Sequence, residues 1–221
     1  MLNKNSHQVG NLWLAKTLWE LGGVRFGDFT LGRTTVHSPV YVNPRRLISR
    51  PSALSRAARV MEEELRTLQA MRNPQAQPFD LIAGIPIGGL HLATAFSLRT
   101  RIPMVYLHPK PGDPEKTAIE GLYSPGQRVL IIDDLLNQGG SLVNMVRELR
   151  DAGLTVTDAI VLIDRQVGGR ERLHEHGCNL VSVLGLETLL NYLMSTTKID
   201  ERVYRKSLDY VEQIRTRTAL N

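Results

Sequence analysis

The chain of 221 residues has the length of one globular domain. Its 42% hydrophobic and 22% charged residues exclude whole-chain disorder, a collagen-like repeat and a coiled coil. No apolar run reaches the roughly 18 residues of a membrane span, so no membrane partner is expected. The single cysteine, Cys178, excludes an internal disulfide and a cysteine-built zinc site. The first residues carry no apolar signal core, and the predicted location is the cytoplasm.

The formal net charge of +5 favours anionic partners. The basic residues are dispersed along the chain and do not form a block of about 5–8 residues. Aromatic residues make up only 5% of the chain, which leaves little material for base-stacking platforms. A small phosphorylated substrate is therefore favoured over nucleic acid.

The first part of the chain predicts a helix, hairpin strands and a second helix. Residues 11–21 have apolar side chains at helical spacing, and a glycine pair follows as a C-cap would. Residues 26–51 are rich in β-branched and aromatic residues with turn formers between them, which is typical of hairpin strands. A second helix is expected from Pro51, because apolar residues again recur on one face.

From Phe79 onward, short apolar runs alternate with helical patterns. The runs lie at residues 81–84, 104–107, 129–132, 159–163 and 180–184. Helical patterns lie at residues 90–98, 142–149 and 170–176. This alternation predicts an α/β fold, with a central, mostly parallel sheet covered by helices on both faces. Ligand sites in such sheets lie at the carboxyl ends of the strands.

The clearest candidate site follows the run at 129–132. Asp133 and Asp134 come directly after it, and residues 137–141 (NQGGS) lead into a helix. The glycines allow close approach of the backbone, and the N–H groups at the helix start form an anion site. Carboxylates beside such a site can accept hydrogen bonds from sugar hydroxyls, so a phosphorylated sugar is predicted, with both acids facing a solvent-filled cleft. The alternative is a glycine-rich helix start without a ligand.

The segment IIDDLLNQGGS resembles the phosphoribosyl-pyrophosphate motif of type I phosphoribosyltransferases. Three further segments resemble orotate phosphoribosyltransferases: FGDFTL with SPVYVNPRRLISRP, AGIPIGGLHLATAFSLRTRIPMVYL, and LIDRQVGGRERLHEHG. The matches run in family order from about residue 9 to residue 190. The resemblance implies the type I phosphoribosyltransferase fold with a small N-terminal hood. It also implies a single domain over 1–221, with a helix and hood strands over 1–51, an α/β core over 52–190 and a C-terminal helix over 191–221.

The resemblance also implies roles for individual residues. Asp133 and Asp134 would bind the ribose hydroxyls of phosphoribosyl pyrophosphate and take part in catalysis. The 5-phosphate would be held by Asn137, Gln138, Gly139, Gly140 and Ser141. The pyrophosphate loop would consist of Ile85, Pro86, Ile87, Gly88 and Gly89. The base would contact Arg33, Tyr41, Val42 and Arg165. Mg²⁺ would arrive on the diphosphate substrate, without direct protein ligands.

Three features depart from the family pattern. Asn137 stands where threonine is usual, and its amide can still donate a hydrogen bond. Gly32 and Arg33 stand where a base-pocket lysine is usual. The catalytic loop, residues 107–120, lacks the usual Arg-Lys pair and contains three prolines. We expect a mobile loop without a helix or a central strand, in which Lys110 and Lys116 are the candidate catalytic cations.

The predicted function is phosphoribosyl transfer to orotate, giving orotidine 5'-monophosphate and pyrophosphate in pyrimidine nucleotide biosynthesis. The family implies a homodimeric enzyme, because its mobile loop reaches into the neighbouring subunit. Two alternatives remain open. One is a phosphoribosyltransferase for another base, and the other is a non-catalytic regulator of the same fold that binds phosphoribosyl pyrophosphate or a nucleotide.

Overall fold

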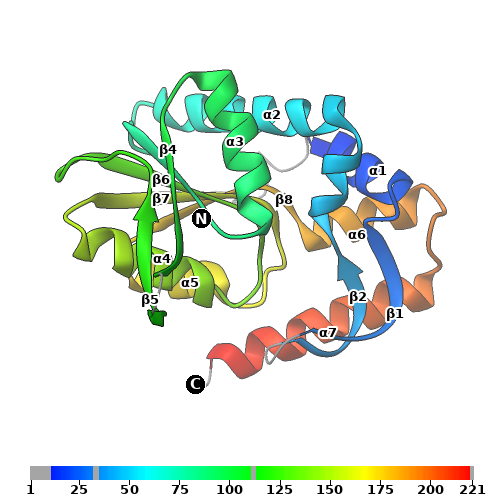
Figure 1. Cartoon of the computed structure of the whole chain (residues 1–221). Helices are drawn as coiled ribbons and strands as arrows, with labels where there is room; N and C mark the ends of the chain where they lie inside the picture. The colour runs from blue at the N-terminus through cyan, green and yellow to red at the C-terminus, as the bar shows by residue number, and fades with distance from the viewer. Residues whose placement is uncertain (1–10, 32–34, 111–112, 220–221) are drawn as a thin grey trace.

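A six-stranded sheet forms the centre of the molecule (Figure 1). The computed structural model describes residues 11–31, 35–110 and 113–219. The strands are β3 (Leu81–Gly84), β4 (Met104–Lys110), β5 (Asp113–Glu120), β6 (Arg128–Leu136), β7 (Thr155–Asp164) and β8 (Asn179–Gly185). They lie in the order β5-β4-β3-β6-β7-β8, and all neighbours are parallel except β4 and β5. The predicted mostly parallel sheet is therefore confirmed.

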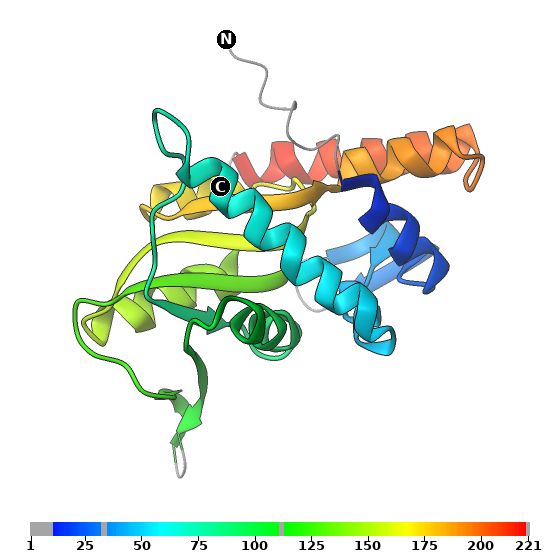
Figure 2. The same cartoon turned by 90° about the horizontal axis from the view of Figure 1, so that it is seen from above.

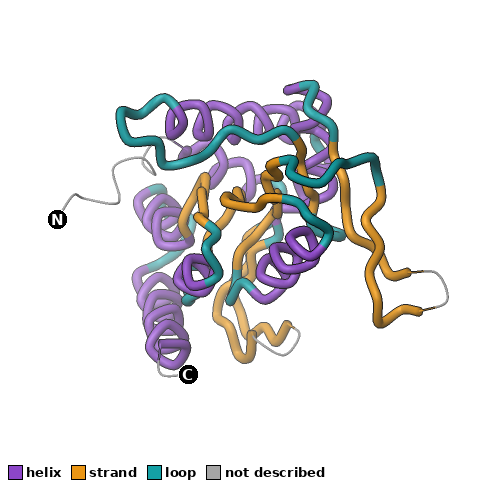
Figure 3. Tube along the Cα trace, turned by 90° about the vertical axis from the view of Figure 1, so that its left-hand side faces the viewer, coloured by secondary structure: helices purple, strands orange, loops and turns teal. Residues whose placement is uncertain are grey.

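Helices cover both faces of this sheet (Figure 3). One face carries α1 (Leu12–Glu20), α2 (Pro51–Gln69), α3 (Gly88–Thr100) and α6 (Leu186–Ser195), and the other carries α4 (Gly140–Asp151) and α5 (Gly169–Glu175). Successive strand residues point to opposite faces. Ile82 and Ile132 are thus buried under the first group of helices, while Leu81 and Ile131 are buried under the second. Burial on both faces explains why the strands are continuous apolar runs.

The N-terminal strands form a separate hairpin. β1 (Val24–Leu31) pairs antiparallel with β2 (Thr35–Val42), as predicted for the hood. The prediction of strands up to residue 51 is wrong at its end, because residues 44–49 form a 3₁₀ turn, η2 (Pro44–Ser49). Proline has no N–H to give to a ladder, and it is well suited to the first position of a helical turn.

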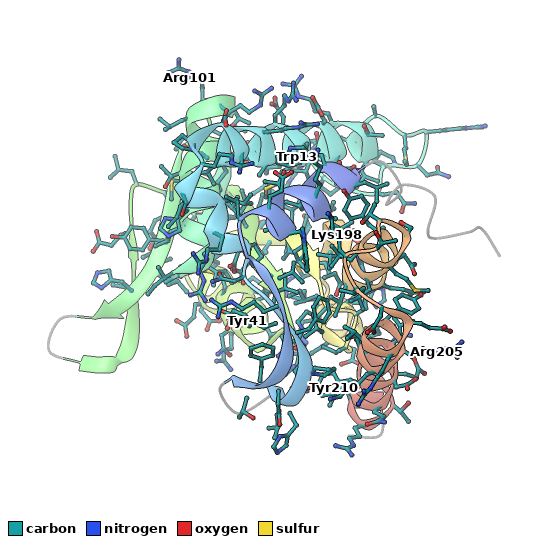
Figure 4. The ribbon with its side chains drawn as sticks, turned by 90° about the vertical axis from the view of Figure 1, so that its right-hand side faces the viewer. Trp13, Tyr41, Arg101, Lys198, Arg205 and Tyr210 are labelled. Carbon is teal, nitrogen blue, oxygen red and sulfur yellow. The ribbon has the colours of Figure 1, made fainter. Side chains whose placement is uncertain are left out.

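The single helix expected over residues 191–221 is two helices. α6 begins at Leu186, inside the expected core segment, and α7 (Glu201–Ala219) follows after residues 196–200. The chain reverses at Thr197, whose φ of 55° lies in the left-handed region without the glycine that would signal it. α7 then runs beneath the β1–β2 hairpin (Figure 1). The tyrosine Oη of Tyr210 donates a hydrogen bond of 3.2 Å to the carbonyl of Val36 on β2 (Figure 4).

The segment expected as a loop, residues 107–120, is a β-hairpin. β4 continues to Lys110, and β5 pairs with it from Tyr106–Glu120 to Pro109–Thr117. The prolines of this segment are expected to prevent a central strand. β5 agrees with that expectation, because it lies at the edge of the sheet, where strands tolerate proline. The hairpin projects from the body of the molecule (Figure 2). Within the described ranges, no helix is both long and apolar enough to cross a bilayer.

Candidate active site

The turn from β6 into α4 forms the candidate phosphate cradle. Gly139 has a φ of 78°, and a Cβ there would lie 3.1 Å from the carbonyl oxygen of Gly169, so glycine is required. α4 begins at the next residue and directs its first N–H groups into the turn. A pocket of about 210 Å³ opens here, lined by Asp133, Leu135, Leu136, Asn137, Gln138, Gly139, Gly140, Ser141, Leu142 and Arg172. The structure thus brings the five predicted cradle residues together with Asp133.

Arg172 is a lining residue that the sequence did not single out. It lies on α5, and its Nη1 donates a hydrogen bond of 3.4 Å to the carbonyl of Gln138 in the cradle. The helix after β7 lies beside the helix after β6, because the two strands are parallel neighbours. This neighbouring position could have pointed to Arg172 from the sequence, because a cation on the first turns of the helix after β7 can reach the phosphate cradle.

Asp133 and Asp134 are consecutive residues of β6. Asp133 is 7% exposed, and its Oδ1 accepts a hydrogen bond of 2.8 Å from the backbone N–H of Asp134. Both acids are expected to face a solvent-filled cleft; Asp133 does line the pocket at the cradle, but it is almost fully buried within β6, which continues past it to Leu136. The Asp134 carboxylate is partly buried, with 16% of its side chain exposed.

Burial raises the pKa of Asp133 well above its usual range, and the neighbouring Asp134 carboxylate raises that pKa further. Burial also raises the pKa of Asp134, against the opposing charge of Arg45. The Nε of Arg45, on η2, lies 3.9 Å from Oδ2 of Asp134. A desolvated acid pair of this kind is stabilised by hydrogen-bond donors or a cation, which the hydroxyls of a sugar or a metal-bound substrate would supply.

The predicted pyrophosphate loop lies beside the acid pair. It spans the end of β3 and the start of α3, with Ile85, Pro86, Ile87, Gly88 and Gly89. Ile85 is buried and Ile87 is 70% exposed, and the peptide bond between Pro86 and Ile87 is cis. A Cβ on Gly88 would lie 2.4–2.7 Å from the carboxyl atoms of Asp134, so the backbone and that carboxylate are in direct contact. The cradle, the acids and this loop therefore form one continuous site.

Arg165 occupies the carboxyl end of β7 and is 5% exposed. Its Nη2 donates a hydrogen bond of 3.0 Å to Oγ of Ser38, a fully buried residue of β2. The bond joins the hood to the central sheet. Burial lowers the pKa of the guanidinium, which nonetheless remains charged at neutral pH. The next residue is fixed as well, because the N–H of Gln166 donates to Asp164 at 2.8 Å.

Two further predicted base contacts, Tyr41 and Val42, are not brought together. Tyr41 and Val42 are adjacent on β2 and point to opposite faces of the hairpin. The Tyr41 ring lies 5.5 Å from the ring of Phe29, whereas Val42 is buried in the core. Figure 4 shows Tyr41 on the hairpin above α7. Arg33 lies outside the described residues.

Lys110 and Lys116 lie on β4 and β5, and the structure describes only their backbone. Beside them on the hairpin, His108 Nε2 lies 2.8 Å from Oε1 of Glu120. Over the described parts of the chain, no three His, Cys, Asp or Glu side chains are grouped as a metal site.

Comparison with known proteins agrees with this arrangement. A family model described as a phosphoribosyl transferase domain matches residues 53–178. The orotate phosphoribosyltransferase of Chlamydia caviae is 36% identical over 189 residues, which are 83% of this chain and 86% of that protein. The crystal structure of orotate phosphoribosyltransferase from Aeropyrum pernix has a TM-score of 0.70 and 34% identity, covering 81% of this chain and 97% of that one.

The UMP synthase of Leishmania donovani aligns with a TM-score of 0.80 and 34% identity over 93% of this chain. The alignment spans 43% of that longer protein. The chain therefore belongs to the phosphoribosyltransferase family and, within it, to the orotate phosphoribosyltransferases. The family resemblance and the fold predicted from the sequence are both confirmed.

Proposed function

We propose that the protein transfers the phosphoribosyl group of phosphoribosyl pyrophosphate to orotate, which gives orotidine 5'-monophosphate and pyrophosphate. This makes it a pentosyltransferase of pyrimidine nucleotide biosynthesis. The observation that carries the proposal is the continuous site at the carboxyl edge of the sheet. There the acid pair adjoins both the phosphate cradle and Gly88 of the pyrophosphate loop.

Each part of the substrate has a candidate partner in this site. Residues 137–141 would hold the 5-phosphate, chiefly through their N–H groups, with Arg172 at the rim. Asp133 and Asp134 would accept hydrogen bonds from the ribose hydroxyls. Arg165 would bind the orotate carboxylate in a charge-assisted pair, in place of or beside its bond to Ser38. Catalysis then consists mainly of positioning and of stabilising the charge on the leaving group.

We also propose that Mg²⁺ enters with the diphosphate. Phosphate oxygens are hard donors of the kind Mg²⁺ prefers, so the ion would be carried by the diphosphate itself, without direct protein ligands. The ion would neutralise part of the diphosphate charge when bound.

The subunit arrangement is a further part of the proposal. The projecting β4–β5 hairpin carries the backbone of Lys110 and Lys116 outward, as an arm that reaches a second subunit of a homodimer would. Both lysines remain predicted catalytic cations. The single-domain organisation and the cytoplasmic location remain predictions from the sequence.

The test is pyrophosphate release from phosphoribosyl pyrophosphate in the presence of orotate, uracil, adenine or hypoxanthine. Orotate should support release, and uracil, which has no carboxylate for Arg165, should be a poor substrate. Equal rates with uracil or a purine would refute the base assignment. Tight binding of the diphosphate without release for any base would refute the enzymatic function and favour the regulator.

A further inference from the structure

Arg45 is a basic side chain beside the acid pair that the sequence did not single out. Its Nε lies 3.9 Å from Oδ2 of Asp134, and about half of its side chain is exposed. At 3.9 Å and with a half-exposed guanidinium, this ion pair contributes only modestly to stability. The position is therefore better explained by what the guanidinium can bind than by what it adds to folding.

The turn that carries Arg45 is fixed to the core. η2 packs against α3 and β6, the two elements that carry the pyrophosphate loop and the acids. Pro44 and Leu47 are both buried. The Arg45 Nε also donates a hydrogen bond of 3.2 Å to Oδ1 of Asn43. The base of this side chain is thus held at the site, while its outer part remains accessible to a ligand.

Asp134 is a common neighbour of Arg45 and the pyrophosphate loop. Its carboxylate lies close both to the Arg45 guanidinium and to the backbone of Gly88. The guanidinium and the segment proposed to hold the diphosphate are therefore both neighbours of the same carboxylate. An arginine can exchange a carboxylate partner for phosphate oxygens, because its planar donors fit both.

The reaction requires positive charge at this position. The bond between the anomeric carbon and the pyrophosphate oxygen breaks, and its electron pair leaves with pyrophosphate. The ring nitrogen of orotate bonds to the anomeric carbon, and its N–H proton is released to solvent. Negative charge thus grows on the pyrophosphate in the transition state, and a cation fixed in place stabilises that charge most. The backbone of Lys110 lies near the tip of a projecting hairpin, whereas Arg45 lies on η2, close to the acid pair.

We propose that Arg45 is a ligand of the leaving pyrophosphate, supplied by the hood of the same subunit. The inference rests on the proposed phosphoribosyl transfer. It assigns to η2 a role in catalysis besides its role in connecting β2 to α2.

The kinetic test compares Arg45→Ala, Arg45→Lys and a control, Arg46→Ala, which removes the neighbouring exposed arginine of η2. Arg45→Ala should lower kcat about 10- to 100-fold and leave the KM of orotate within about twofold. Arg45→Lys should recover part of that loss, since it restores the charge, and Arg46→Ala should match the wild type. A kcat of Arg45→Ala within about threefold of the wild type would overturn the proposal.

The binding test uses calorimetric titration with magnesium pyrophosphate and, separately, with ribose 5-phosphate. Arg45→Ala should weaken pyrophosphate binding about 10-fold or more and leave ribose 5-phosphate binding unchanged. An equal loss for both ligands would show that Arg45 acts through the acid pair, and no loss for either would show that it is a surface residue. Both results overturn the inference. If the wild type binds both ligands and releases no pyrophosphate with any base, the proposed function fails instead.

Discussion

Replacing the buried Asp133 carboxylate by an amide should stabilise the ligand-free protein and weaken substrate binding. Asparagine keeps the shape of the side chain and the Oδ1 that accepts the N–H of Asp134. It removes a charge that is 7% exposed and lies beside a second carboxylate. Both features disfavour ionisation in the folded state. Ionising Asp133 in the folded wild type therefore costs stability, and the amide of the variant avoids that cost.

The expected gain in the free energy of unfolding for Asp133→Asn is about 1 kcal/mol, within the range for relieving a destabilised functional position. For a chain of this length that corresponds to a rise in Tm of about 2–4 °C. The loss in binding should be larger. A hydrogen bond to a charged group contributes about 1.5–3 kcal/mol, so the affinity for phosphoribosyl pyrophosphate should fall about 10- to 150-fold.

The pH dependence fixes the sign of the stability effect. The folded state raises the pKa of Asp133, so it binds the proton more tightly than the unfolded chain, in which that pKa is about 3.9. The stability of the wild type should therefore fall, relative to the variant, as the pH rises from about 4 through the higher folded pKa. The stability advantage of Asp133→Asn should be smallest at about pH 4, grow as the pH rises, and become constant once the pH exceeds the folded pKa of Asp133.

Thermal unfolding from about pH 4 to pH 8 without ligand, with calorimetric titration of phosphoribosyl pyrophosphate at neutral pH, measures both effects. A variant less stable than the wild type at neutral pH would refute the reasoning, since the charge would then stabilise the fold. A stability difference independent of pH would also refute it.

Three further substitutions test other parts of the site and the fold. Arg172→Ala should weaken binding of ribose 5-phosphate by about 10-fold in calorimetry, while Arg147→Ala, a control on the exposed side of α4, should not. Arg165→Ala should raise the KM of orotate far more than the KM of phosphoribosyl pyrophosphate in steady-state kinetics, and equal increases would contradict the base assignment. Asp158→Ala should lower the free energy of unfolding by about 2–3 kcal/mol in urea, because its 4% exposed carboxylate accepts hydrogen bonds from Gln77, Thr157 and Asn179; an unchanged midpoint would contradict this.

The sequence predicted those parts of the fold that depend on local periodicity. The run at 81–84 is β3 itself, and the patterns at 90–98, 142–149 and 170–176 lie within or overlap α3, α4 and α5. The break between α6 and α7 could not be predicted in this way. A threonine, and no glycine or proline, takes the left-handed conformation there, and packing of α7 on the hood holds it. The β4–β5 hairpin escaped prediction because its prolines suggest a loop unless the edge position is known.

For the site, the contiguous motif was easier to predict than its neighbours. The acids and the phosphate cradle follow one another along the chain, so their spacing in the sequence predicts that they lie together. Arg45 and Arg172 come from η2 and α5, and only the packing of those elements against β6 and α4 brings them to the site. Burial of Asp133 likewise depends on how far β6 continues.

The hydrogen bond between Arg165 and Ser38 connects two parts of the molecule that can change separately in sequence. Ser38 belongs to a two-stranded sheet that pairs only within itself, whereas the acids lie on β6 of the six-stranded sheet, and the cradle and Arg165 directly follow its strands β6 and β7. Residues 53–178, matched by the shared family model, include the second part and leave out the first. Under the proposed function, substitutions in the hairpin would reshape the space around the base without altering the register of the strands that precede the phosphate cradle. Such a division allows one phosphoribosyl site to be combined with different acceptors.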